Sequence, residues 1–174
     1  MHAAHRRYLV FEQGLGAILI NFGLNFGIAW AMFRGMSAVP MWGTQSIAGD
    51  TIGTSFVLPF LTCLIVTPLV RREVTRGRLP PFERGPADYR LLARLPNAAF
   101  RRGLFLGAMA TVLISPIAIF AFHAAGLDGI EPGAFMWVKA AYAGLLAGIV
   151  SPLIAARALA DTASQGRAVP NTTP

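Results

Sequence analysis

Four long apolar stretches restrict the fold of this chain more than any other feature of its sequence. They cover residues 8–33, 48–70, 101–125 and 134–157. Each reaches or approaches the roughly 20 residues that a helix needs to cross the hydrocarbon core of a bilayer. Only 13% of the residues are charged and the mean hydropathy is +0.55, whereas soluble domains have about a quarter of their residues charged. We therefore expect an all-α integral membrane protein, a four-helix bundle that forms a single membrane domain.

Basic residues are concentrated on one side of the expected spans, which predicts the orientation of the chain. The opposite side carries only Arg34 and Lys139. Basic residues in short connections stay in the cytoplasm, so we expect both termini there and a bacterial-type inner (plasma) membrane. We expect the C-terminal tail, residues 158–174, to be disordered. The connection 71–100 and the start of the third stretch carry nine arginines: Arg71, Arg72, Arg76, Arg78, Arg84, Arg90, Arg94, Arg101 and Arg102.

The net charge of +7 raises the question of an anionic partner. Basic residues that flank membrane spans need no partner beyond anionic lipid headgroups, so we expect lipid and no nucleic acid. Tyr89, Leu92 and Leu95 recur at helical spacing within the connection, which fits either a short helix in the headgroup region or a solvated basic loop. The arginines expected at the headgroups are Arg71, Arg72, Arg90, Arg94, Arg101 and Arg102.

A weak internal repeat relates the two halves of the sequence. Paired arginines precede a Met-Trp pair by 35 positions in each half, and the second and fourth stretches end in IVTPL and IVSPL. Other spacings differ between the halves, so coincidence is a competing explanation. A real repeat would make the bundle two tandem helical hairpins of the same orientation, related by an axis along the membrane normal.

Small and polar residues in the first stretch predict close helix packing. Gly23 and Gly27 lie on one side of a helix, and Asn21 and Asn25 lie nearly opposite. Glycine lets a second backbone approach, and asparagine needs hydrogen-bonding partners, so we expect both faces to meet protein. The first span should then be central in the bundle or in an oligomer. We favour hydrogen bonds between helices over a transport site for the two asparagines.

Ionisable residues at membrane depth are costly and often mark a pathway. For Glu12 the alternative is a headgroup-level contact with Arg6 or Arg7, and for Lys139 it is extension outward to the interface. Asp50 is either a carboxylate stabilised at a helix N-terminus or the partner of Lys139 or His123. The expected polar path from one side to the other consists of Glu12, Asn21, Asn25, Asp50, Thr54, His123 and Lys139.

These residues support two functional hypotheses. The first is a small membrane protein that binds or translocates a small solute, proton or ion along the polar path, as a homo-oligomer or within a larger membrane complex. The second is a structural or accessory subunit whose basic connection contacts lipid or a cytoplasmic partner. The sequence contains no catalytic motif such as HExxH or GxSxG, and Cys63 is its only cysteine. We therefore predict no enzyme activity, no cofactor and no metal.

Overall fold

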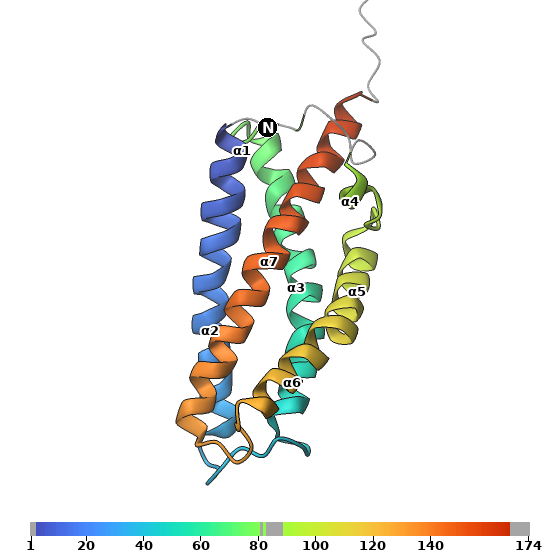
Figure 1. Cartoon of the computed structure of the whole chain (residues 1–174). Coiled ribbons are helices and arrows are strands. Elements are labelled where there is room, and N and C mark those ends of the chain that lie inside the picture. The colour runs from blue at the N-terminus through green and yellow to red at the C-terminus, as the bar shows by residue number, and fades with distance from the viewer. Residues whose placement is uncertain (1–2, 81, 83–88, 168–174) are drawn as a thin grey trace, which may run out of the picture.

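The structure is a computed structural model in which the described residues are entirely helical apart from turns, loops and one isolated bridge (Figure 1). It describes residues 3–80, 82 and 89–167, without the side chains of residues 3, 4, 90, 91 and 164–167. In chain order the elements are α1 (Ala3–Arg7), η1 (Tyr8–Leu15), α2 (Gly16–Phe33), α3 (Ile47–Thr75), α4 (Arg90–Ala93), α5 (Ala99–Met109), η3 (Ala110–Ile114), α6 (Ser115–Ala124) and α7 (Pro132–Arg167).

These elements form four helices that are long and apolar enough to cross a membrane. The π-helical segments η1 and η3 join α1 to α2 and α5 to α6 without a break, which gives span one and span three. Span two is α3 and span four is α7. The four spans run His5–Phe33, Ile47–Thr75, Ala99–Ala124 and Pro132–Ala163. Within a few residues these are the stretches expected from the sequence, so the all-α membrane fold is confirmed.

Span four, not span one, is the central helix of the bundle. In the most apolar window of each span, 67% of the residues are buried in span four and 11% in span one. Small residues of α7 allow this, since a Cβ added to Gly144 would lie 3.2 Å from the Ile18 carbonyl of α2. A Cβ added to Gly23 or Gly27 would meet no atom within 4 Å. Within the described chain the glycine face of span one points away from the bundle, so contact between this face and protein stays a prediction for an oligomer.

The packing of the spans is the same in both halves of the chain. Span one packs on span four, span three packs on span two, and spans two and four pack on each other. Among the described residues, no Cα atom of α2 lies within 8 Å of one in α3, and the same holds between span three and α7. If spans one and two are exchanged with spans three and four, every one of these contacts becomes another contact of the same set. This is the packing expected of two tandem hairpins that are related by a twofold axis along the bundle.

The two ends of the bundle differ in what they carry. Both the start of α1 and the end of α7 lie at one end, which we call the terminal end (Figure 1). The loops 34–46 and 125–131 lie at the other, the loop end, where Val39 N–H donates to the Ile130 carbonyl at 2.8 Å. Asp128 Oδ1 accepts from the Met41 N–H, also at 2.8 Å. The loop end is therefore closed by contacts between the two hairpin loops.

The last helix is longer than the sequence indicated. Residues 158–174 were expected to be a disordered tail, but α7 continues to Arg167, and Ala158, Leu159 and Ala160 are fully buried. Asp161 explains the difference, because its carboxylate forms ion pairs with arginines of three spans. Residues 168–174 lie outside the described part of the chain.

The short helix α4 lies against the protein. Leu92 and Leu95 are 7% and 6% exposed and belong to the main apolar core. The helical spacing of the connection is therefore explained by packing at the terminal end of α7, where α4 makes its contacts. The solvated loop is therefore wrong for these two leucines, whereas the position of the short helix at the headgroups stays a prediction.

Candidate functional site

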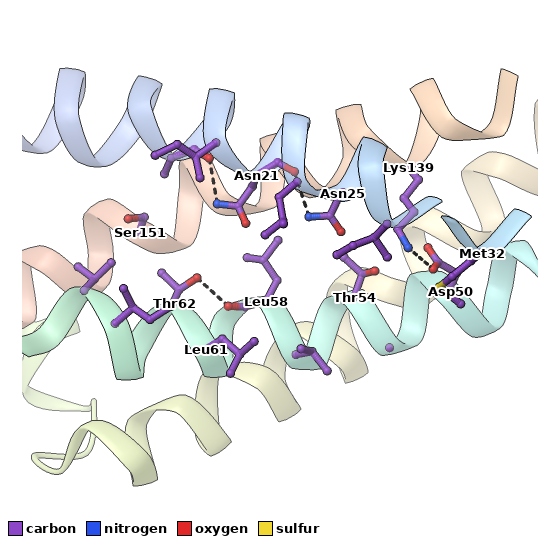
Figure 2. A pocket seen from close by; sticks show the side chains of 18 of the residues that line it. Asn21, Asn25, Met32, Asp50, Thr54, Leu58, Leu61, Thr62, Lys139 and Ser151 are labelled. Carbon is purple, nitrogen blue, oxygen red and sulfur yellow. Dashed lines mark hydrogen bonds and ion pairs between the residues drawn. The ribbon is translucent and has the colours of Figure 1, made fainter. Parts of the chain in front are cut away.

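A groove separates α2 from α3 along much of their length, with α7 behind it (Figure 2). Its cavity has a volume of about 640 Å³. Both walls are apolar stripes with a residue at every fourth position: Ile20, Leu24, Ile28 and Met32 on α2, and Val57, Leu61, Ile65 and Leu69 on α3. These eight side chains are all exposed, because no helix covers them. We call this cavity the α2–α3 groove.

Asn21 and Asn25 supply polar groups halfway along the groove. Each amide nitrogen donates to the carbonyl four residues earlier in the same helix, Asn21 to Ala17 and Asn25 to Asn21, both at 3.0 Å. Figure 2 shows the two amide oxygens directed toward α3, into the groove. The expected hydrogen bonds between helices are therefore wrong, since neither asparagine bonds to another helix within the described residues. Both side chains line the groove.

An ion pair lies near the loop end of the groove. Lys139 of α7 donates to Asp50 Oδ1 of α3, and the side chains are 3% and 8% exposed. The ammonium group also lies 6.0 Å from the centre of the Phe33 ring. Of the two partners considered for Asp50, Lys139 is the one the structure brings to it. Lys139 does not extend to the interface, because its charge is neutralised inside the bundle.

Glu12 and its neighbours form the polar part of the groove at the terminal end. Glu12 is exposed and makes no ion pair with Arg6 or Arg7 in the described part of the chain. Gln13 is held more tightly, because its Oε1 accepts from Ser151 Oγ and its Nε2 donates to the Tyr8 hydroxyl, both at 2.9 Å. The bond from Ser151 joins span four to span one, and the bond to Tyr8 lies within span one.

Sequence reasoning did not select Gln13 or Ser151 as groove residues. Both line the groove, and Gln13 lies in the π-helical segment η1. A π-helix turns by a different angle per residue than an α-helix, so helical spacing counted from Asn21 places Gln13 incorrectly. The Ser151-Pro152 pair was a visible signal of a polar group at this depth, but its partner was not.

Of two further residues of the expected path, one lines the groove and the other does not. Thr54 lines the groove between Asp50 and Asn25 (Figure 2). His123 does not line it, and its side chain is exposed on α6, a helix that packs with α3 on the side away from α2. The prediction for His123 is therefore wrong, because span three does not contribute to the groove.

The arginine prediction fails most clearly at Arg102, which is fully buried. Its guanidinium donates to Thr67 Oγ1 and to Asp161 Oδ2, both at 3.2 Å. Arg157, which the sequence did not select, pairs with the same carboxylate and donates to Asn97 Oδ1 at 2.5 Å. An arginine at the end of a span is placed at the headgroups by default, but here a carboxylate on α7 provides a buried partner.

The other arginines of the connection differ in exposure. Arg71 is part of the same cluster, 3.7 Å from Asp161 Oδ2, and its side chain is 42% exposed. Arg72, Arg94 and Arg101 are exposed. The side chain of Arg90 lies outside the described part of the chain. Contact between these exposed arginines and anionic headgroups stays a prediction.

No protein family, curated protein or solved structure matches this chain. The described residues also contain no group of three His, Cys, Asp or Glu side chains close enough to hold a metal ion. The α2–α3 groove is therefore the feature of the structure that can support a proposal about function.

Proposed function

We propose that this protein binds a small, largely apolar solute in the α2–α3 groove. The observation that supports this is a cavity of about 640 Å³ with apolar walls and unpartnered amide oxygens of Asn21 and Asn25 in its middle. Small-molecule sites are typically roughly 300–1,000 Å³, mostly apolar, with a few polar groups that orient the ligand. The groove has these properties within a single chain, so the proposal requires no second copy.

The size of the groove favours a small molecule over a partner helix. A transmembrane helix about 10 Å across and about 30 Å long occupies roughly 2,400 Å³. The cavity of about 640 Å³ instead lies within the range of small-molecule sites. Its apolar walls suit a slender molecule.

The position of the charges favours binding over ion movement. Charged groups lie only at the two ends of the groove, Glu12 at one and the Asp50–Lys139 pair at the other. The middle offers amide and hydroxyl groups, which are adequate for a neutral solute and costly for an unaccompanied ion. We propose that the solute enters sideways from the bilayer, between the exposed apolar stripes, because no described helix covers them.

The proposal includes an orientation and a membrane. The start of α1, the end of α7 and the described arginines of the connection lie at the terminal end. By the positive-inside rule we propose that this end faces the cytoplasm, in a bacterial-type inner membrane. The acyl region of that membrane would then supply the solute. Exposed Arg72, Arg94 and Arg101 would contact anionic headgroups on the cytoplasmic leaflet.

Photolabelling in vesicles tests the binding proposal. The purified protein is reconstituted and exposed to a hexadecane that carries a diazirine, with increasing unlabelled hexadecane as competitor. We expect labelling of Leu61 and Leu24 to be competed at low competitor concentrations, because a site is saturable. Labelling of lipid-facing Leu64 and Leu19 should fall only as the probe is diluted in the bilayer. Equal behaviour of the two sets of leucines would contradict a binding site.

A further inference from the structure

The hydrogen-bond roles of the groove residues indicate which class of solute it accepts. An asparagine side chain ends in one donor group and one acceptor atom, and electron density alone rarely distinguishes them. Here the surroundings decide. The end of each side chain that lies 3.0 Å from a backbone carbonyl must be the N–H₂ group, since two oxygens at that distance would repel. The atom left facing the groove is therefore an oxygen at both Asn21 and Asn25.

Two hydroxyl groups that line the groove, those of Thr62 and Ser151, use their hydrogen inside the protein. Thr62 donates to the Leu58 carbonyl at 2.6 Å, and Ser151 donates to Gln13 Oε1 at 2.9 Å. A hydroxyl has one hydrogen, so both oxygens remain only as acceptors. From Ser151 to Asn25 these four side chains therefore offer oxygen acceptors to the groove, while each asparagine N–H₂ group, which keeps a second hydrogen, lies against the backbone of α2.

We infer that the solute is an apolar molecule that carries hydrogen-bond donor groups, such as hydroxyl or amine groups on a hydrocarbon skeleton. The inference rests on the proposed function and adds the chemical class of the ligand. A donor placed in the groove satisfies an amide oxygen that has no partner within the described residues. A solute with acceptors alone, such as an ether or ester, would bury its oxygen beside other oxygens.

The spacing of the two amide oxygens adds a geometric requirement. Asn21 and Asn25 are four residues apart on α2, which corresponds to about 6 Å along the helix axis. Both oxygens point to the same side of the helix (Figure 2). A solute that meets both has two donor groups roughly 6 Å apart along its length, or one donor that bonds to either oxygen.

The test compares two competitors that differ in one hydrogen-bond donor. Hexadecanol donates and accepts, whereas hexadecyl methyl ether only accepts. Each is titrated against the diazirine-labelled hexadecane in vesicles that contain the whole protein. One hydrogen bond corresponds to about a threefold to tenfold difference in binding, so hexadecanol should compete at that much lower concentration. In the double variant Asn21→Leu/Asn25→Leu the two competitors should become equal.

The matched control is Thr111→Val, because Thr111 also bonds to a carbonyl of its own helix, Gly107 at 2.9 Å, but does not line the groove. Hexadecanol should keep its advantage in this variant. Saturable labelling by the hydrocarbon probe in the double variant shows that its groove is intact. Equal competition in the wild type, or an advantage that survives in the double variant, would overturn the inference and leave the binding proposal standing. Labelling that never saturates in the wild type would instead remove the proposed function.

Discussion

Asp161 is the carboxylate that pairs with three arginine side chains near the terminal end of the bundle. Arg102 and Arg157 are almost fully buried, and both pair with it. Replacing Asp161 with Asn would leave two buried charges without a counter-charge. We expect Asp161→Asn to lower the free energy of unfolding by about 3–5 kcal/mol, the usual cost of breaking a buried pair from one side.

Denaturation of the purified protein by sodium dodecyl sulfate in mixed micelles measures this loss. The control is Glu73→Gln, since Glu73 pairs with Arg78 at 3.3 Å in an exposed position. Exposed pairs contribute at most about 1 kcal/mol, so this variant should unfold close to the wild type. Similar losses in the two variants would show that the Asp161 cluster is not the stabilising contact we describe.

Single residues show how far sequence reasoning reached. Asp50 and Lys139 were predicted as a possible pair because both are costly at membrane depth, and the structure joins them. Arg102 was placed at the headgroups because nothing in the sequence shows that Asp161, 59 residues later, turns toward it. The free-energy cost of burying a charge predicts that the charge has a partner. Which distant residue is the partner depends on how the helices pack.

At the scale of helices, Gly107 determines how closely α5 approaches α3. A Cβ added there would lie 2.8 Å from the Phe56 carbonyl oxygen, which is backbone and cannot move away on its own. We expect Gly107→Ala to separate the helices and lower the free energy of unfolding by about 1–3 kcal/mol, the usual cost of overpacking. The same denaturation experiment measures it.

Gly23→Ala is the matched control for this contact. A Cβ at Gly23 meets no atom within 4 Å, and alanine is the better helix former by up to about 1 kcal/mol. This variant should therefore be as stable as the wild type or slightly more stable. A loss at Gly23 equal to that at Gly107 would indicate that α2 packs through its glycine face after all.

The four spans could be predicted almost to their ends, because hydrocarbon thickness and hydropathy are properties of a local window. Their arrangement could not. Glycines at intervals of four occur in spans one and four, yet only Gly144 and Gly148 of span four meet another helix closely, while Gly23 and Gly27 do not. A small residue permits close packing without selecting the partner, so the sequence could not show which span is central.

For the whole molecule, the start of α1 and the end of α7 lie at the same end of the bundle, which predicts that both face the same side of the membrane. In a Cys63→Ala background, Ser37→Cys lies in a loop at the loop end and Thr75→Cys lies at the terminal end, both exposed. We expect a membrane-impermeant maleimide to label Ser37→Cys in cells with a permeable outer envelope and an intact inner membrane. Thr75→Cys should react only after that membrane is opened. The reverse pattern would contradict the cytoplasmic placement of the terminal end.

Filling the α2–α3 groove tests whether it is a binding site most directly. Leu61 and Leu64 are both exposed on α3, but only Leu61 lines the groove. We expect Leu61→Trp to abolish the saturable labelling of Leu24 by the diazirine-labelled hexadecane, because the indole occupies the cavity. Leu64→Trp should leave that labelling unchanged. Saturable labelling of Leu24 that persists in Leu61→Trp, or that is lost equally in Leu64→Trp, would contradict solute binding in the groove.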